Sequence, residues 1–428
     1  MNSLFELFYQ SSGVCTDTRK IKPNSLFIGL KGPNFDGNSY VQQAVDSGAK
    51  YAVTENKEFA DNKQIFYVEN CLVFLQRLAN FHRKKFDIPL IGITGSNGKT
   101  TTKELVHAVL AKKYNTLCTF GNLNNHLGVP FTLLELNENH EIAIIEMGAN
   151  KPGDIQELVD IAEPTCGLIT GVGAAHIEGF GSLEGVIQTK SELYNFLKIH
   201  QGTIFVNGDD PILKKQLGNY FKHFTYGTSS KNTVSGSISE MSPFLNFNWQ
   251  RSEGKTNFVQ AKMIGAYNLI NYLSAAAVGV FFGLSDEQIT QALTDYTPNN
   301  NRSQITKTEK NTVIMDAYNA NITSMKAALE SFDLIQHENK CVILGDMREL
   351  GSLSAEAHQE IVDYLNERHW LTYLVGAEFG KTNRPTTMHH FNETNQLLEH
   401  LESNILTQGF VLVKGSRGIA LEHVINKL

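Results

Sequence analysis

Short apolar runs alternate with longer amphipathic stretches from residue 88 onward. An unbroken apolar run between polar residues is typical of a buried strand, and apolar residues at i, i+3, i+4 and i+7 are typical of a helix with one buried face. Because the two patterns alternate at these lengths, they predict a parallel sheet with crossover helices. The predicted strands are 89–94, 141–147, 166–170 and 203–207, and the predicted helices are 101–112, 154–162 and 183–197.

The regions on either side of this alternation have patterns of their own. Residues 233–263 change to a period of two, as in Phe244-Leu-Asn-Phe-Asn-Trp249, which predicts an antiparallel appendage before a helix at 268–282. The polar stretch 297–302 is typical of a linker. The predicted elements before residue 87 are strands 25–30, 51–54 and 64–68 and helices 41–47 and 72–83, and the predicted strands after the linker are 313–316, 341–344, 373–375 and 410–413.

These patterns predict an α/β fold with three domains. The first domain covers 1–86, and the second, 87–303, contains a central P-loop-type parallel sheet with the antiparallel appendage. The third, 304–428, is a Rossmann-like α/β domain without a Gly-x-Gly-x-x-Gly, so it is not evidently a dinucleotide site. A hydrophobic content of 41% over 428 residues is enough to form a core in each domain.

Charge and cysteine content narrow the class of protein. A net charge of −7 without a basic cluster gives no footprint for nucleic acid. The five cysteines are scattered, without the spacing of a zinc site or a disulfide framework, and this fits a reducing cytoplasm. The N-terminus lacks an export signal, and the longest apolar run, 273–284, is too short to cross a bilayer. We expect a cytoplasmic protein without membrane insertion.

The segment Ile91-Gly-Ile-Thr-Gly-Ser-Asn-Gly-Lys-Thr-Thr-Thr102 carries the strongest chemical signal. An apolar strand enters a short glycine loop, and a Lys-Thr pair opens the next helix. Such a loop surrounds phosphate oxygens with backbone N–H groups, while the lysine adds a positive charge and the threonine hydroxyl binds Mg²⁺. The loop is shorter than the strict Walker pattern. The residues expected to bind nucleotide here are Gly95, Ser96, Asn97, Gly98, Lys99, Thr100 and Thr101.

Three residues further along are candidates for a metal site. Glu146 follows an apolar run and lies where α/β sheets place ligands, so it is either a magnesium ligand or a carboxylate turned to solvent. His176, in a glycine-rich loop, is either a ligand or a structural side chain. Lys190 falls on the apolar stripe of the helix 183–197. A lysine there must pair with an acid, extend to solvent, or lose its charge, for example as a carbamate formed with CO₂.

Polar residues in the second half of the chain suit a nucleotide and a carboxylate. Asn268 and Asn271 share a helix face, where they read a base edge or Asn268 caps the helix. Arg302 is placed to reach phosphate, and Asp316 ends a strand where its carboxylate can accept ribose hydroxyls. The turn Lys414-Gly-Ser416-Arg417 offers two cations for a carboxylate or phosphate, or is a solvated turn.

Together these motifs resemble the Mur ligase superfamily over nearly the whole chain. They most resemble the branch that adds D-alanyl-D-alanine to UDP-N-acetylmuramoyl-tripeptide. The motifs, in order, are Thr16-Asp-Thr-Arg19, Thr94-Gly-Ser-Asn-Gly-Lys-Thr-Thr101, Asn122-Leu-Asn-Asn125, Glu146-Met-Gly-Ala149, Ala175-His176, Thr189-Lys-Ser-Glu192, Asn268-x-x-Asn271, Asp316-Ala-Tyr-Asn-Ala-Asn321, Gly345-Asp-Met-Arg-Glu-Leu-Gly351 and Lys414-Gly-Ser-Arg-Gly418.

The resemblance implies an ADP-forming amide ligase for peptidoglycan precursors that acts through an acyl phosphate. It implies that the first domain binds the UDP-sugar peptide and that the third binds the dipeptide and closes on ATP. We expect a monomer with ATP and Mg²⁺ as cofactors. The implied catalytic residues are Lys99, Glu146, His176 and carbamylated Lys190; the metal ligands are Thr100, Glu146, His176 and Lys190; Asn268, Asn271, Arg302 and Asp316 position ATP; and Thr18, Arg19, Asn124, Asn125, Lys414, Ser416 and Arg417 bind the substrates.

Three positions depart from the family pattern. Thr18 replaces a serine, Tyr267 stands where histidine is common, and Ile322 replaces the proline after Asn321. The tripeptide-forming branch matches less well, because its Asp-Asn-Pro-Arg is absent. A folylpolyglutamate-type ligase and a nucleotide-binding protein without turnover are the alternatives. The sequence does not decide whether the third residue of the peptide is lysine or diaminopimelate.

Overall fold

The computed structural model describes residues 2–59, 62–173, 177–241, 243–298 and 303–428. Contacts divide the chain into two compact units. Unit 1 comprises 1–92, 115–148 and 154–165, and unit 2 comprises 93–114, 149–153 and 166–428. The strand β7 (Leu90–Thr94) runs from the first unit into the second. None of the helices in the described ranges is long and apolar enough to span a bilayer.

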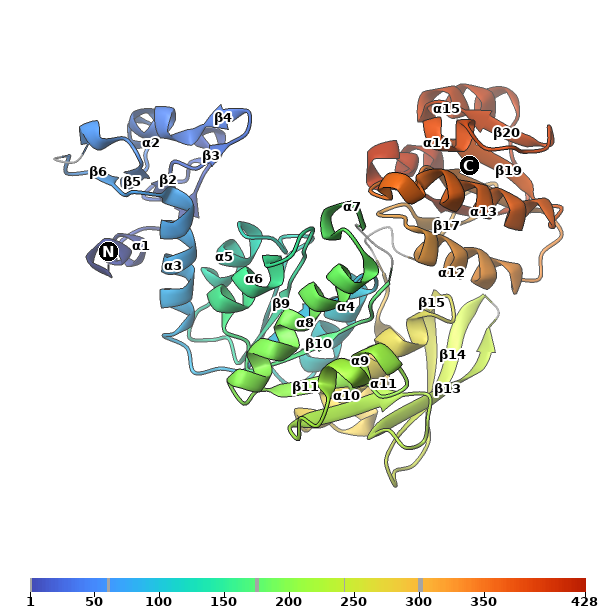
Figure 1. Ribbon diagram of the computed structural model, residues 1–428, viewed down its shortest axis with the longest axis horizontal. Coiled ribbons are helices and arrows are strands. Elements are labelled where there is room, and N and C mark those ends of the chain that lie inside the picture. Colours follow the sequence, from blue (N-terminus) through green and yellow to red (C-terminus); the bar gives the residue numbers. More distant parts are fainter. Residues whose placement is uncertain (1, 60–61, 174–176, 242, 299–302) are drawn as a thin grey trace. The chain divides into compact units, whose positions relative to one another are not determined.

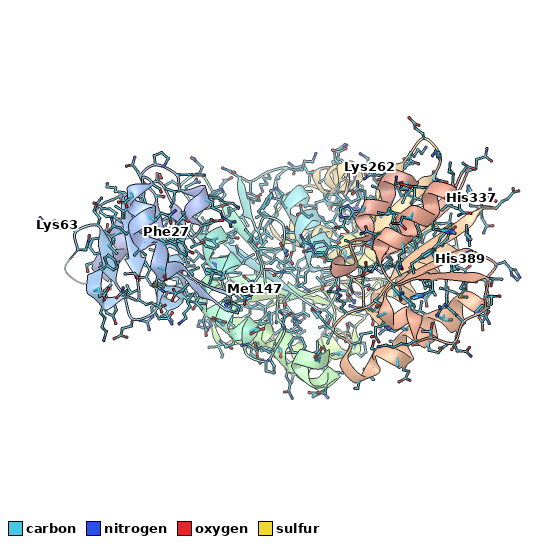
Figure 2. The ribbon with its side chains drawn as sticks, turned by 90° about the horizontal axis from the view of Figure 1, so that it is seen from above. Phe27, Lys63, Met147, Lys262, His337 and His389 are labelled. Carbon is cyan, nitrogen blue, oxygen red and sulfur yellow. The ribbon has the colours of Figure 1, made fainter. Side chains whose placement is uncertain are left out.

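Unit 1 contains a small parallel sheet in the order β1-β2-β5-β6. Successive residues of β2 serve two cores: Phe27 packs with α2, and Leu26 and Ile28 pack with α1 and α3. Figure 2 shows Phe27 inside this region and Lys63 at its outer edge. The bounds are α1 Asn2–Tyr9, β1 Val14–Cys15, β2 Leu26–Ile28, β3 Lys31–Gly32, β4 Phe35–Asp36, α2 Val41–Asp46, β5 Tyr51–Thr54, β6 Ile65–Tyr67 and α3 Cys71–Arg83.

The rest of unit 1 places a second group of elements against α3. The helix α3 begins where Asn70 accepts a hydrogen bond from the Val73 amide, and its buried face packs on α5 and α6 (Figure 1). The strands β8 and β9 pair in parallel. Glu146 is the last residue of β9 and lies at its carboxyl end. The bounds are β8 Thr116–Cys118, α5 Gly128–Leu133, β9 Ile142–Glu146 and α6 Asp154–Ala162.

Unit 2 extends a parallel sheet into an antiparallel one. The strands follow the order β15-β14-β13-β12-β11-β10, with β10 to β13 parallel and β14 and β15 antiparallel. The predicted antiparallel strands are therefore confirmed, but they continue the sheet rather than form a separate appendage. The bounds are α4 Lys99–Leu110, β10 Cys166–Ile169, α7 Ile177–Phe180, α8 Leu183–Ile199, β11 Thr203–Asn207, α9 Pro211–Leu217, β12 His223–Gly227, β13 Val234–Met241, β14 Phe244–Arg251, β15 Asn257–Ile264, α10 Asn268–Phe281 and α11 Asp286–Asp295.

The C-terminal part of unit 2 is a sheet in the order β16-β17-β21-β18-β19-β20 with helices on both faces. Alternate residues of β18 face opposite layers: Val342 and Leu344 pack on α12 and α13, whereas Cys341 and Ile343 pack on α15 (Figure 1). All pairs are parallel except β16 with β17. The bounds are β16 Gln304–Lys307, β17 Thr312–Asp316, α12 Ile322–Asp333, β18 Lys340–Gly345, α13 Ser354–Asn366, β19 Leu371–Val375, α14 Ala377–Gly380, β20 Met388–Phe391, α15 Thr394–Ser403 and β21 Phe410–Lys414.

Candidate functional site

The glycine loop joins β7 to α4, and its shape requires glycine at two places. Gly95 has φ 145° and Gly98 has φ 80°, in the region that favours glycine. A Cβ at Gly95 would lie 2.0 Å from Thr170 Oγ1, and a Cβ at Gly98 would lie 2.7 Å from Asn271 Oδ1. The loop is therefore held closely by β10 on one side and α10 on the other. The helix α4 begins at Lys99, two residues before the predicted start.

Polar groups after β10 fix the path of this loop. The Thr170 hydroxyl donates to the Asn97 carbonyl, and the Ser96 amide donates to the Gly171 carbonyl at 2.9 Å. The Ser96 hydroxyl lies 3.0 Å from the Gly173 carbonyl oxygen. Sequence reasoning missed Thr170, although a polar residue at the end of a buried strand beside a glycine-rich segment is a usable signal.

Lys99 places its ammonium directly on the loop. Its Nζ donates to the carbonyls of Gly95 at 2.6 Å and Ser96 at 3.2 Å, so a positive charge lies among the backbone groups that face a phosphate. Thr100 and Thr101 are buried in the first turn of α4. This arrangement combines a fixed cation, a helix N-terminus and a buried hydroxyl, as a nucleotide phosphate site requires.

Asn268 and Asn271 form a hydrogen-bonded chain between α10 and α4. The Thr102 hydroxyl donates to Asn271 Oδ1 at 3.1 Å, and Asn271 Nδ2 donates to Asn268 Oδ1 at 2.9 Å. Asn268 Nδ2 then donates to the Ile264 carbonyl at 2.7 Å. The capping alternative for Asn268 is wrong, because Tyr267 is the residue before the helix and Asn268 accepts from a side chain. The use of the two amides to hold ATP stays a prediction.

Tyr267 occupies the position where the family usually has histidine. Its hydroxyl lies 2.8 Å from Ser303 Oγ, and burial raises the pKa of this phenol. The Ser303 amide in turn donates to Asp316 Oδ1 at 3.2 Å. Tyr267 therefore joins α10 to the first residues of the C-terminal sheet through a neutral hydrogen bond.

Asp316 and Lys414, two predicted site residues, bind each other. Lys414 Nζ lies 2.5 Å from Asp316 Oδ2, and Lys414 is only 2% exposed. The solvated-turn alternative is therefore wrong for Lys414. Arg417 is exposed, and its guanidinium lies 5.5 Å from the ring centre of Tyr318.

Arg348 is a second exposed cation beside Arg417. Its amide donates to Ser416 Oγ at 2.9 Å, and its Nη2 donates to the Gly418 carbonyl at 3.2 Å. Asp346, two residues earlier, accepts the amides of Glu378 and Phe379 at 2.9 Å each, which anchors this loop on α14. Sequence reasoning quoted the motif that contains Arg348 without giving the residue a role. Its signal is a cation three residues after the end of a strand.

One hydrogen bond joins the glycine loop to the C-terminal helix α12. Asn321 caps α12 by accepting from the Ser324 amide at 2.9 Å, and its Nδ2 donates to Asn97 Oδ1 at 2.8 Å. Asn321 thus places the N-terminus of α12 beside the glycine loop, which we also call the phosphate loop. Ile322, which replaces the usual proline, is the first residue of the helix.

In unit 1, Glu146 is a buried carboxylate with one oxygen available. The residue is 1% exposed, so the alternative of a solvated strand end is wrong. Its Oε1 accepts from Asn124 Nδ2 at 2.7 Å, whereas Oε2 has no hydrogen-bond partner among the described residues. A buried anionic oxygen without a donor is costly. This feature fits a divalent cation, which prefers carboxylate oxygen.

Asn125, which is expected to bind the substrate, lies just before the start of α5. Asn125 Oδ1 accepts the amides of Leu127 and Gly128, so it stabilises the start of α5 and leaves its Nδ2 as a donor. Among the described residues no group of three His, Cys, Asp or Glu side chains is arranged for a metal. His176 and Arg302 lie outside the described residues.

Lys190 lies inside unit 2 as the apolar stripe predicts. It is 2% exposed, with its Nζ 5.3 Å from the ring centre of Phe180. The alternative in which Lys190 extends to solvent is therefore wrong. Leu183 is 44% exposed and does not belong to the buried stripe, which begins at Val186.

Thr18 and Arg19 lie in a short 3-10 helix after β1. Asp17 accepts the Arg19 amide at 3.0 Å and its Nη2 at 2.8 Å, while the Arg19 side chain stays 86% exposed. The hydrogen bond from Arg19 lowers the pKa of Asp17 to about 2. Arg19 therefore presents a guanidinium held in one orientation on the surface of unit 1.

Comparisons with known proteins identify the family of this chain. Three family models match: "Mur ligase family, catalytic domain" over 10–83, "Mur ligase middle domain" over 93–279 and "Mur ligase, glutamate ligase domain" over 301–417. The chain is 35% identical to the UDP-N-acetylmuramoyl-tripeptide–D-alanyl-D-alanine ligase of Bacillus subtilis, with 97% of this chain and 93% of the relative covered.

Two solved structures share the fold over the whole chain. The MurF structure from Acinetobacter baumannii has a TM-score of 0.89 at 28% identity and covers 100% of this chain and 98% of its own. The MurF ligase from Thermotoga maritima in complex with ADP has a TM-score of 0.88 at 25% identity, with coverages of 99% and 97%. The chain belongs to the Mur ligase family. It is an α/β enzyme of the ATP-dependent ligase class with the three-domain architecture of that family.

Proposed function

We propose that this enzyme joins D-alanyl-D-alanine to UDP-N-acetylmuramoyl-tripeptide in peptidoglycan precursor synthesis. The observation that carries the proposal is the glycine loop with Lys99, fixed between β10 and α10, in a chain that aligns with ligases of this name over nearly its full length. The domain boundaries 86/87 and 303/304 remain predictions.

The chemistry takes place in two transfers. The terminal carboxylate of the tripeptide attacks the γ-phosphorus of ATP, so that an acyl phosphate forms and ADP leaves. The amine of the dipeptide then attacks the acyl carbon through a tetrahedral intermediate, and the C–O bond to phosphate breaks. Products are the amide, ADP, inorganic phosphate and a proton. Lys99 and the amides of Asn97 and Gly98 stabilise charge on the transferred phosphoryl group.

The oxygen donors that this chain supplies suit magnesium. We assign Thr100 Oγ1, Glu146 Oε2, His176 and Lys190 as its ligands, and the open oxygen of Glu146 supports this set. Bound magnesium supplies positive charge that neutralises the phosphate oxygens. Asn124 keeps the Glu146 carboxylate oriented through its hydrogen bond to Oε1.

Lys190 acts as a carbamate in this proposal. The neutral amine attacks CO₂, an N–C bond forms and one proton leaves, so the side chain becomes an anionic oxygen ligand. Burial disfavours the ammonium and favours the neutral amine that reacts with CO₂, and a bound Mg²⁺ would offset the negative charge of the carbamate.

The remaining polar residues bind the three substrates. Asn268, Asn271, Arg302 and Asp316 position ATP. Ser416, Arg417 and Arg348 receive the carboxylate of the dipeptide, with Lys414 holding their loop through Asp316. Thr18 and Arg19 anchor the uridine nucleotide, and Asn124 and Asn125 contact the sugar peptide.

We further propose that the enzyme works as a monomer in the cytoplasm. All five cysteines are free thiols, as expected where thiols stay reduced. Sedimentation of the purified chain at several concentrations tests the monomer.

ADP release from purified protein tests the function. We expect release with ATP, Mg²⁺, the UDP-muramoyl tripeptide and D-alanyl-D-alanine together, and none when D-alanine or glutamate replaces the dipeptide. Better turnover with folate and glutamate would instead support a folylpolyglutamate-type ligase. Tight ATP binding without turnover on either substrate pair would support a non-catalytic protein.

A further inference from the structure

Three large apolar side chains are exposed at the end of unit 2 where β11 and β12 begin. Phe221 is 74% exposed, Ile199 is 76% exposed and Phe281 is 43% exposed. Aromatic contacts place Phe281 5.2 Å from Phe205 and 6.0 Å from Phe224, both measured between ring centres. Large exposed apolar side chains that cluster mark a contact surface more often than scattered ones do.

Hydrogen bonds bring the segments that carry these side chains together. The Tyr220 hydroxyl donates to the Gly202 carbonyl at 2.7 Å, which joins the turn before β12 to the turn after α8. Lys222 Nζ donates to the Gln201 carbonyl at 3.0 Å in the same place. The Tyr114 hydroxyl donates to the Phe282 carbonyl at 2.8 Å, so the turn after α4 lies at the end of α10.

The charge of these segments differs from the charge of the chain. The chain carries a net charge of −7, yet residues 111–115, 195–202, 211–224 and 281–284 contain six lysines and neither aspartate nor glutamate. Asp295 neutralises Lys112 at 3.0 Å, and Lys198 is turned inward onto the Gln216 carbonyl at 2.6 Å. The exposed lysines that remain are Lys113, Lys214, Lys215 and Lys222. We call Ile199, Phe221, Phe281 and these four lysines the basic apolar patch.

The basic apolar patch lies at the end of the sheet opposite the phosphate loop. Ile199 and Phe221 precede the first residues of the parallel strands β11 and β12. The phosphate loop follows the carboxyl end of β7, and the Thr170 amide, which donates to the Thr94 carbonyl at 2.9 Å, places the carboxyl end of β10 at the same edge. A large partner on the patch therefore leaves the phosphate loop open.

We propose that the basic apolar patch binds the surface of an anionic lipid bilayer. Lysine ammonium groups meet lipid phosphates, and Phe221, Ile199 and Phe281 enter the boundary between headgroups and acyl chains, which is the arrangement of interfacial membrane anchors. The lysines favour an anionic surface over a second copy of this chain, because the negative charge of that copy lies outside its own basic apolar patch. The inference does not depend on the substrates proposed above.

The test replaces Phe221 by tryptophan as a local reporter. The F221W variant is mixed with vesicles of phosphatidylglycerol and phosphatidylcholine, or of phosphatidylcholine alone, and its emission is read as a difference from the wild-type spectrum. We expect a blue shift, and quenching by lipids brominated in the acyl chain, with the anionic vesicles only. The matched control F258W carries its reporter on β15 at a position that is 53% exposed, and it should not respond.

A second variant tests the charge. The double variant K215E/K222E should bind anionic vesicles more than about tenfold more weakly, and binding of the wild type should fall as salt rises. Both sets of variants should keep wild-type ligase turnover, because their side chains are exposed and lie away from the phosphate loop. The proposal is overturned if F221W and F258W respond alike, if neither responds, or if the F221W signal follows protein concentration without lipid, which would indicate self-association.

Discussion

Lys414 and Asp316 form an ion pair between two neighbouring strands. The residues face each other in the parallel register of β21 and β17, and Lys414 Nζ lies 2.5 Å from Asp316 Oδ2. Lys414 is 2% exposed, so its ammonium relies on this carboxylate and on the Asn319 carbonyl at 3.5 Å. The pair fixes the turn that presents Ser416 and Arg417. Its first role is therefore to hold the turn that follows β21.

Removing one partner of this pair should destabilise the enzyme strongly. We expect Asp316→Asn to lower the free energy of unfolding by about 3 kcal/mol, because the buried ammonium loses its counter-charge. The double variant Asp316→Asn with Lys414→Met should recover part of this loss. Urea unfolding of the two single variants and the double variant measures the coupling, and additive effects would contradict a direct interaction.

Lys99→Ala should abolish turnover without unfolding the protein. The ammonium on the glycine loop would no longer stabilise the transferred phosphoryl group, an effect of about 3 kcal/mol or more on the barrier. ADP release measures the loss, and the melting temperature checks the fold. Lys231→Ala, an exposed lysine on the turn between β12 and β13, is the control and should keep full activity. Near-normal ligation by Lys99→Ala would exclude the loop as the phosphate site.

Substitutions of Asn124 and Glu146 should change the magnesium dependence of turnover in different ways. Asn124→Ala removes the donor to Glu146 Oε1, so we expect the Mg²⁺ concentration for half-maximal ADP release to rise about tenfold or more. Glu146→Gln removes the charged ligand itself and should lower turnover at least about a hundredfold at saturating Mg²⁺. Magnesium titrations of both variants make the comparison. An unchanged titration curve for Asn124→Ala would mean that Asn124 does not orient the ligand.

Short carboxylates should restore activity only in a variant whose residue 190 leaves the ligand position empty. Lys190→Ala should lose most activity, and acetate should restore part of it by occupying the free ligand position. Lys190→Arg should not be rescued, because the guanidinium fills the space and cannot take up CO₂. Carbon-13 spectra of protein equilibrated with labelled CO₂ should show a carbamate signal that Lys190→Ala lacks. An active alanine variant without that signal in the wild type would return Lys190 to a structural role.

His82 should make the stability of unit 1 depend on pH. Burial lowers the pKa of this histidine, whose Nδ1 lies 3.0 Å from the Tyr9 hydroxyl and whose Nε2 lies 2.9 Å from the Leu136 carbonyl. The folded state then binds fewer protons than the unfolded state below about pH 6.5, so stability is present above this pH and is lost as pH falls. Melting temperatures from pH 8 to 5 should fall less for His82→Gln than for the wild type. Parallel curves would assign the loss to other groups.

The linear pattern of this chain determined most of the elements that form and located the glycine loop for which we propose the phosphate chemistry. Apolar runs predicted most strands of the central and C-terminal sheets, and helical periods predicted helices, because the spacing of apolar residues reflects which face is buried. The glycine loop with Lys99 was visible for a similar reason: a strand, a turn and a helix N-terminus that bind phosphate are contiguous in sequence. Elements such as α9 and β20 were missed because their buried faces are short.

Tertiary structure alone decided which polar groups are partners. Asp316 pairs with Lys414, Asn124 with Glu146 and Asn321 with Asn97. Each pair joins residues far apart in sequence, and whether a polar side chain meets a protein group or a ligand depends on burial and geometry that no local pattern encodes. The same holds for the basic apolar patch, since its residues lie in four separate segments that adjoin only when β11, β12, α4 and α10 have packed.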